Sequence, residues 1–161
     1  MYNIFDTDNS LAPLIARISL GVVILPHGLQ KLLGIWGGKG FLITMENFQA
    51  TGLPFLVGFI IICAESFGAF FLILGFLSRI SALFISAIMV GAILKVHGKF
   101  GFFMNWSGKQ AGEGFEFHLL AIALSVIVLL YGGGKWALDS IINRYINSKK
   151  EHTDKAGDLP V

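Results

Sequence analysis

Residues 55–77 read FLVGFIIICAESFGAFFLILGFL, and this stretch decides the class of the protein. Its single charged side chain is Glu65. The hydrocarbon core of a bilayer is about 30 Å thick, and roughly 20 helical residues are needed to cross it. Strands of a membrane barrel are shorter and alternate apolar with polar residues, which this stretch does not do. Residues 55–77 are therefore predicted to form a membrane-spanning helix.

Three other apolar segments are long enough for the same role, at about residues 11–33, 80–96 and 115–131. Only Ser78 and Arg79 separate the second span from the third, so those two helices are expected to be antiparallel neighbours. The prediction is an all-α fold, an integral membrane four-helix bundle with up-down antiparallel topology.

The segments outside the spans complete the predicted organisation. Residues 41–48 carry apolar side chains at helical spacing, which predicts a short interfacial helix between the first and second spans. Residues 1–142 would form the membrane domain, and the polar residues 143–161 a flexible cytoplasmic tail. The glycine-rich stretches 37–40 and 132–135 lack the spacing of a phosphate-binding loop, so we expect flexible connections there.

The composition excludes several classes of protein. Of the 161 residues, 55% are hydrophobic and 14% are charged, which is too apolar for a disordered chain or for one soluble core. A net charge of +2 without a basic stripe counts against a nucleic-acid partner. The lone Cys63 excludes an internal disulfide and a cysteine-based metal centre. The expected partners are the lipid bilayer and either another protein or a second copy of the chain, and no metal site is expected.

The distribution of Lys and Arg predicts the orientation in the membrane. An even number of spans puts both termini on one side of the bilayer. That side carries slightly more Lys and Arg than the other, which places both termini in the cytoplasm. Arg79, in the tight second connection, is interpreted as a topology anchor, and Arg17 as a side chain that snorkels to the interface.

Ionisable side chains inside the spans are the candidates for function, because each is costly in hydrocarbon unless it is paired or hydrated. Most of them fall in the outer half of the predicted bundle. The candidates for a ligand or proton site are His27, Lys31, Glu65, Glu116 and His118, and His97 and Lys95 carry less weight.

Glu65 shares its helix face with the small residues Gly68 and Ala69, so it is expected to face the bundle interior. His27 is the expected partner by depth, and the two groups would share a proton. We predict that His27, Glu65 and the polar groups at the start of the fourth span converge in one cavity. The alternative is a buried acid that a neighbouring helix satisfies for purely structural reasons.

Four motifs resemble those of the DoxX family. His27-Gly28-Leu29-Gln30-Lys31 resembles the HGxxK signature of its first span. Gly52-Leu53-Pro54 resembles the entry to its second span, and Glu65, Gly68, Leu74, Gly75 and Arg79 fit the pattern that follows. Residues 114–117, Gly-Phe-Glu-Phe, resemble the opening of its fourth span. The resemblance covers residues from about 14 to 138.

The resemblance implies a four-helix, multi-pass protein of the bacterial inner membrane. Some members of that family form part of a thiosulfate:quinone oxidoreductase, and others are linked to membrane oxidoreductase assemblies and to thiol or quinone stress. It therefore implies an oxidoreductase-associated role, with the catalytic residues unassigned. This chain has no redox cysteine pair and no recognisable cofactor motif, so no intrinsic cofactor is expected and quinone is the candidate ligand.

Three functions remain open from the residues. The first is a membrane subunit of a quinone-linked or thiol- or sulfur-linked redox complex, with a small-molecule or quinone site in the outer half of the bundle. The second is a small-solute or proton-coupled transporter with Glu65 as the carrier. The third is a membrane scaffold without chemistry of its own.

Overall fold

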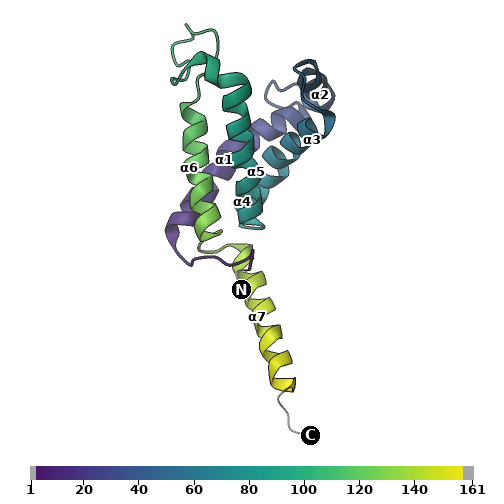
Figure 1. Cartoon of the computed structure of the whole chain (residues 1–161), viewed down its shortest axis with the longest axis vertical. Helices are drawn as coiled ribbons and strands as arrows, with labels where there is room; N and C mark the ends of the chain where they lie inside the picture. Colours follow the sequence, from purple (N-terminus) through teal and green to yellow (C-terminus); the bar gives the residue numbers. More distant parts are fainter. Residues whose placement is uncertain (1–2, 158–161) are drawn as a thin grey trace.

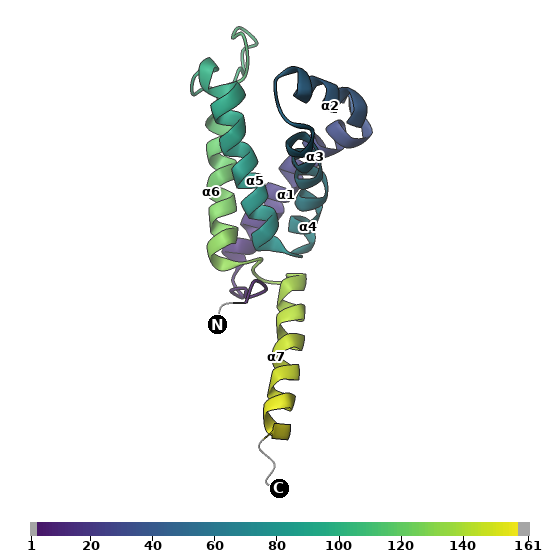
Figure 2. The same cartoon turned by 45° about the vertical axis from the view of Figure 1, so that its right-hand side comes forward.

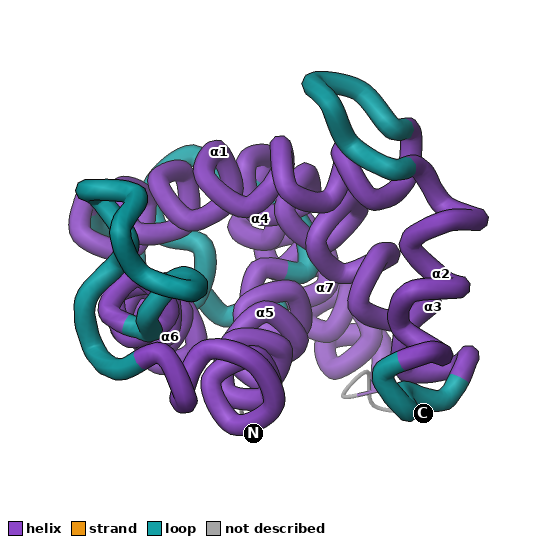
Figure 3. The backbone as a smooth tube through the Cα atoms, turned by 90° about the horizontal axis from the view of Figure 1, so that it is seen from above, coloured by secondary structure: helices purple, strands orange, loops and turns teal. Residues whose placement is uncertain are grey.

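The computed structural model describes residues 3–157, and within that range the regular structure is helical, with no strand (Figures 1 and 3). The elements are α1 (Leu11–Leu33), α2 (Gly40–Ala50), α3 (Phe55–Cys63), η1 (Ala64–Gly68), α4 (Ala69–Leu74), α5 (Ser78–Ala92), η2 (Ile93–His97), η3 (Gly98–Phe100), α6 (Glu116–Tyr131) and α7 (Leu138–Gly157). The short helix expected over residues 41–48 is present as α2.

Three helical stretches are long and apolar enough to cross a membrane. They are α1, the continuous run Phe55–Leu74 made by α3, η1 and α4, and the continuous run Ser78–Phe100 made by α5, η2 and η3. The fourth expected span corresponds to α6, which is apolar but only 16 residues long. The second span ends earlier than expected because Gly75 adopts a left-handed conformation, with a φ of 69°, directly after Leu74.

Two of these runs contain a π-helical turn. The element η1 interrupts the second run at Ala64–Gly68, and η2 interrupts the third at Ile93–His97. A π turn holds one residue more than an α turn and is frequent at functional sites. Both turns contain candidate residues, Glu65 in the first, and Lys95 and His97 in the second.

The helices pack as one bundle, from which α7 projects (Figures 1 and 2). We call the end that bears the N-terminus and α7 the base, and the opposite end, with α2 and residues 101–115, the top. From the base, α5 runs up to the top, and α6 runs back down beside it. The helix α1 crosses the bundle and packs against both α4 and α6.

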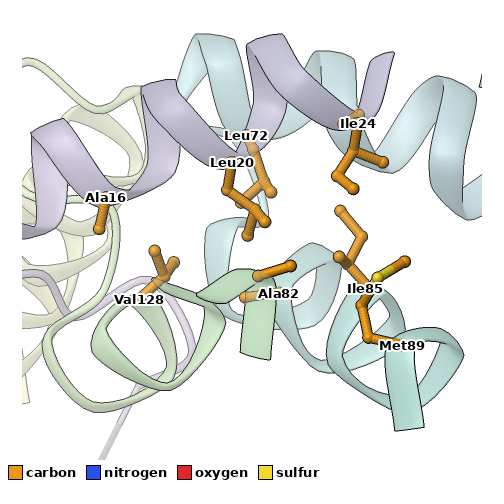
Figure 4. Packing of buried hydrophobic residues seen from close by; sticks show 10 residues of the cluster. Ala16, Leu20, Ile24, Leu72, Ala82, Ile85, Met89 and Val128 are labelled. Carbon is orange, nitrogen blue, oxygen red and sulfur yellow. The ribbon is translucent and has the colours of Figure 1, made fainter. Parts of the chain in front are cut away.

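The core lies where α1, α4, α5 and α6 face one another. Leu20 and Ile24 of α1 point toward Leu72, Ile85 and Val128, and each of these side chains is at most 1% exposed (Figure 4). Small residues let α1 approach closely. A Cβ atom at Gly21 would lie 2.8 Å from the carbonyl oxygen of Ala69, so a larger residue would force the two helices apart.

Arg17 lies buried at the base. We expected its side chain to snorkel to the membrane interface, and it does not. Its side chain is 2% exposed, and its guanidinium donates hydrogen bonds to carbonyl oxygens at the end of α4 and in the connection after α6. The distances are 2.6 Å to Gly133, 2.9 Å to Leu72 and 2.6 Å to Ile73. The guanidinium is stable there because these carbonyl oxygens take the place of water around the buried cation.

The glycines of residues 132–134 are packed rather than loosely placed, in contrast to the flexible connection expected. A Cβ atom at Gly133 would lie 2.6 Å from Ser78 Oγ, and one at Gly134 would lie 2.5 Å from the backbone nitrogen of Leu14. Glycine is therefore required here by close approach between segments that are distant in sequence.

The polar segment after residue 142 is largely helical. Where we expected a flexible tail, α7 extends to Gly157, and the expected domain boundary falls inside this helix. Its first turn is fastened to the bundle, since Asp139 accepts hydrogen bonds from the backbone nitrogens of Leu77, at 2.8 Å, and Ser78, at 2.9 Å. Asn143 adds a 2.8 Å bond to Asp6.

Candidate functional site

An ion pair joins α1 to the π turn η1. Lys31 Nζ donates to Oε2 of Glu65. Glu65 faces the bundle interior and is 5% exposed as a residue, while the side chain of Lys31 is 29% exposed. The pair therefore combines an enclosed carboxylate with an ammonium group that remains partly accessible from outside the bundle.

Gly28 sets the position of this pair. A Cβ atom at Gly28 would lie 2.3 Å from the carbonyl oxygen of Glu65 and 2.5 Å from the backbone nitrogen of Ser66. The backbone of α1 therefore rests directly on η1, and Lys31 lies three residues further along, on the same side of the helix. Gly28 and Lys31 therefore contribute to the same contact between α1 and η1. The glycine permits the close approach of the two backbones, and the lysine side chain then reaches the carboxylate of Glu65.

The partner of Glu65 differs from the one expected by depth. We expected His27 to pair with Glu65, but the ring of His27 lies 6.2 Å from the ring of Phe117, and Lys31 takes the carboxylate. The reason is the reach of the lysine side chain, whose four methylene groups let an ammonium group that starts higher on the helix extend to a deeper acid.

A second contact joins η2 to α6 at the top of the bundle. The rings of His97 and His118 lie 4.2 Å apart between centroids. His97 Nδ1 is 2.8 Å from the carbonyl oxygen of Glu113, which fixes the orientation of that imidazole. His118 is 6% exposed, and its Nδ1 has no hydrogen-bond partner. Buried polar atoms are nearly always paired, so this nitrogen is a natural contact for a ligand.

Phe117 lies between the histidines of α1 and α6. Its ring centroid is 6.2 Å from that of His27 and 5.6 Å from that of His118. The phenyl ring of Phe117 carries no group that can donate or accept a proton, so Phe117 supplies an apolar wall at this level of the bundle. The ring contacts thus connect His27, Phe117, His118 and His97 in one row across three helices.

Glu116 organises the connection at the top. Its Oε1 accepts hydrogen bonds from the backbone nitrogen of Met104 and from Nε1 of Trp106, both at 2.9 Å. Glu113 accepts one from the backbone nitrogen of Asn105 at 2.7 Å. Lys95 is exposed on η2. Through its bonds to Met104 and Trp106, Glu116 holds the top connection in place, a structural role that the sequence analysis did not predict.

The sequence-predicted residues therefore fall into three groups of contacts. Lys31 pairs with Glu65, the histidines follow the row at Phe117, and Glu116 holds the top connection. Convergence of His27, Glu65 and the fourth span on one cavity stays a prediction. Among the described residues, no group of three or more His, Cys, Asp or Glu side chains could hold a metal ion. The groups can donate and accept protons and hydrogen bonds.

Sequence reasoning did not predict the contacts that the polar residues make at the base. Arg79 donates to the carbonyl oxygens of Asp6, at 3.1 and 3.2 Å, and of Leu130, at 3.2 Å, and also to that of Leu129. With Arg17 and Asp139 it ties the N-terminal segment, α5, α6 and α7 together. The sequence feature that could have indicated these contacts is the glycine run 132–134, because such a run marks a place where segments approach closely.

Comparison with known proteins gives two matches. The DoxX family model matches residues 12–98, more than half of the chain. This region includes Arg17, His27, Lys31, Glu65 and His97. The chain is also 27% identical over 132 residues to a protein of Bacillus subtilis (strain 168) named "Putative oxidoreductase CatD", in an alignment that covers 82% of this chain and 87% of that protein. No solved structure gives a significant match.

Proposed function

Because the chain belongs to the DoxX family of membrane proteins, we propose that it is the membrane subunit of a redox complex. The name of the Bacillus subtilis relative, an oxidoreductase, supports this class of activity. The ligand is a quinone or another small redox-active molecule, bound in the half of the bundle nearer the top. A protein partner supplies the electrons, since the chain has no redox cysteine pair of its own.

The topology that we propose with it has four spans. In this arrangement α6 is the fourth span, packed beside α5 in the up-down order, and α2 lies in the interface. Both termini are cytoplasmic, and the membrane is the bacterial inner membrane. The support is the apolarity of α6, its direction relative to α5 and the slight excess of Lys and Arg at the base.

The Lys31–Glu65 pair, whose carboxylate is buried, is the observation that carries the proposal. Removing two charges from water costs several kcal/mol per ion, and apolar residues of similar volume are often as stable. An ionisable pair inside a membrane bundle is therefore a functional feature by default. Its location in a π turn and the partial exposure of Lys31 fit a group that meets a ligand.

The chemistry asked of these residues is proton handling. Reduction of a quinone to a quinol takes up two electrons and two protons, and the protons must reach the carbonyl oxygens through positioned acids. Lys31 with Glu65 forms one donor, and His118, through Nδ1, is placed to contact the ligand from α6. Phe117 contributes apolar surface beside His118 and His27.

The test is purification of the full chain from its native membrane in mild detergent, followed by identification of bound quinone and partner proteins. Wild-type protein is expected to carry quinone, and Lys31→Met to carry much less. Lys109→Met, which removes an exposed lysine near the top, is the matched control and should keep it. A tight partner without any ligand would instead indicate a scaffold. Solute-dependent proton uptake by vesicles that contain the protein alone would indicate a transporter.

A further inference from the structure

The connection between η3 and α6, residues 101–115, presents aromatic side chains at the top of the bundle (Figures 1 and 2). Phe103 and Trp106 are 67% and 86% exposed, and Phe102 is exposed beside them. Residues 107–110, Ser-Gly-Lys-Gln, are also exposed and form the middle of the connection, which is furthest along the chain from both helices. The connection is thus divided into an aromatic part that adjoins the helices and a polar tip.

The backbone of this connection makes hydrogen bonds within the segment and to the start of α6, as irregular backbone near a bilayer must. The backbone nitrogen of Phe115 donates to the carbonyl oxygen of Gly101 at 3.2 Å. The backbone nitrogen of Glu116 donates to the carbonyl oxygen of Phe102 at 2.9 Å. The Glu116 carboxylate in turn accepts a 2.9 Å bond from the backbone nitrogen of Met104. These groups do not need water as a partner, so this part of the connection can lie against lipid.

The level of Trp106 is set by α6. Its Nε1 donates to Oε1 of Glu116, the first residue of α6, at 2.9 Å. From Glu116 to Tyr131 the helix rises about 22 Å, at 1.5 Å per residue. A glutamate side chain together with its hydrogen bond adds at most about 8 Å. The indole nitrogen of Trp106 therefore lies no more than about 30 Å above the level of Tyr131, and this distance is the thickness of the hydrocarbon core.

Exposed aromatic residues mark both ends of this span. Tyr131 and Trp136 are exposed at the base. At the top, Phe103 lies near the level of Trp106, because its carbonyl oxygen packs 2.3 Å from where a Cβ atom of Gly114 would be. Trp and Tyr are enriched at both membrane–water interfaces, where their rings lie at the headgroup level. The separation of the two aromatic levels fits one bilayer.

We propose that residues 101–115 form a lipid-anchored cap, with the rings of Phe103 and Trp106 at the headgroup level of the top side and with the polar tip in water. The partner is the bilayer interface, and no particular headgroup or lipid charge is required. The cap also touches the candidate site, since the carbonyl oxygen of Glu113 lies 2.8 Å from His97 Nδ1. This inference rests on the membrane embedding of the bundle in the proposed function and not on its redox role.

A soluble protein is a weaker match for this surface. The part of the cap that such a protein would reach first is the polar tip, residues 107–110. The exposed rings lie nearer to the helices, at the level that lipid occupies around the bundle. A protein partner would therefore have to displace lipid in order to contact Phe103 and Trp106.

The experiment locates Trp106 by its fluorescence in nanodiscs of phosphatidylcholine. Trp36→Phe with Trp136→Phe, both at exposed positions, leaves Trp106 as the sole tryptophan. Lipids with bromine near the start of the acyl chains quench rings near the headgroups, and lipids with bromine near the chain ends quench rings at the bilayer centre. We expect quenching by the first lipid to be at least about two-fold stronger, because Trp settles at the interface. The difference between wild type and Trp106→Phe gives the same signal without the two background substitutions.

The matched control moves the tryptophan to the tip of the cap. In the same background, Trp106→Phe with Lys109→Trp should give emission at longer wavelength and little quenching by either lipid. Acrylamide, a water-soluble quencher, should act at least about two-fold more strongly on this control than on Trp106, because the tip lies beyond the interface.

Two results would overturn the proposal. Trp106 that behaves like the tip control would lie in water, and its surface would then be free for a protein partner. Stronger quenching by bromine near the chain ends would place Trp106 in the bilayer centre instead of at its interface. Absence of bound quinone from the purified protein would leave the position of Trp106 unchanged, so the cap and the redox role can fail separately.

Discussion

Gly28 of α1 lies against the backbone of Glu65, so closely that a Cβ atom at position 28 would be 2.3 Å from the Glu65 carbonyl oxygen. This contact decides where Lys31 can reach, since the lysine follows Gly28 by three residues on the same helix. The buried ion pair is thus a consequence of backbone packing, and it can be tested through the glycine as well as through the charges.

Gly28→Ala is expected to push α1 away from η1, because the added methyl group meets backbone atoms that cannot rotate aside. Overpacking of this kind typically costs about 1–3 kcal/mol of unfolding free energy. Unfolding in detergent, followed by circular dichroism, measures it. Gly91→Ala is the control, since a Cβ atom at Gly91 would have no neighbour within 4 Å. Equal stability of the two variants would contradict the close approach.

Lys31→Met is expected to destabilise the protein by about 1–3 kcal/mol, because it leaves the Glu65 carboxylate enclosed without its cation. Adding Glu65→Leu should restore much of the loss, since two apolar side chains can replace an ion pair. A double-mutant cycle from denaturant unfolding gives the coupling between the two residues. Additive losses would show that Lys31 and Glu65 act independently.

Glu65→Gln separates a structural use of the acid from a proton-carrying one. Glutamine keeps the shape and a carbonyl acceptor for Lys31, but it cannot ionise. We expect the variant to fold like the wild type and to lose quinone-linked activity, whereas Glu65→Leu should also lose stability. The control is Glu46→Gln, at an exposed position on α2. A fully active Glu65→Gln protein would contradict a proton-carrying role for Glu65.

Arg17→Met is expected to cost about 3–5 kcal/mol, since it removes several buried hydrogen bonds made by one charged group. Arg17→Lys should recover only part of this loss, because an ammonium group lacks the planar fork that reaches α4 and Gly133 together. Thermal unfolding compares the two with Lys109→Met, an exposed position. Full stability of Arg17→Lys would show that charge alone matters at this site.

Asp139→Ala should release the first turn of α7, because both carboxylate oxygens bond to the start of α5. The loss of such a cap is about 0.5–2 kcal/mol. Hydrogen exchange of residues 138–145 is expected to accelerate, while α1 and α6 stay protected. Asp139→Asn, which keeps one carbonyl oxygen, should lie between the alanine variant and the wild type. If α7 exchanges equally in all three proteins, the cap does not hold it.

The positions of the apolar helices were predictable from sequence, because hydropathy over about 20 residues is a local property. The family resemblance on the HGxxK and glutamate motifs was confirmed by the match to residues 12–98. The partner of Glu65 was not predictable by depth, because side-chain reach decided it. The two π turns were also not predictable, since each adds a residue to a turn and shifts the face of every residue that follows.

The partners of the polar residues at the base were not predicted, for another reason. Arg17 donates hydrogen bonds to carbonyl oxygens that lie at least 55 positions later in the chain. Asp139 accepts hydrogen bonds from backbone nitrogens that lie about 60 positions earlier. No periodicity within a window reports such partners. The expected flexible glycines illustrate the same limit, because only the neighbours of Gly133 distinguish a tight crossing from a loose loop.

The hydrogen bonds of Arg17 also impose an order on biosynthesis. The guanidinium belongs to the first helix that the ribosome makes, but its acceptors at Leu72, Ile73 and Gly133 are made later, the last of them near the end of the chain. Until residue 133 has been translated, the nascent protein must keep that cation hydrated at the edge of the bilayer. A chain that stops before residue 133 lacks the Gly133 carbonyl oxygen, so the Nε–H group of Arg17 has no acceptor there and only the bonds to Leu72 and Ile73 can form.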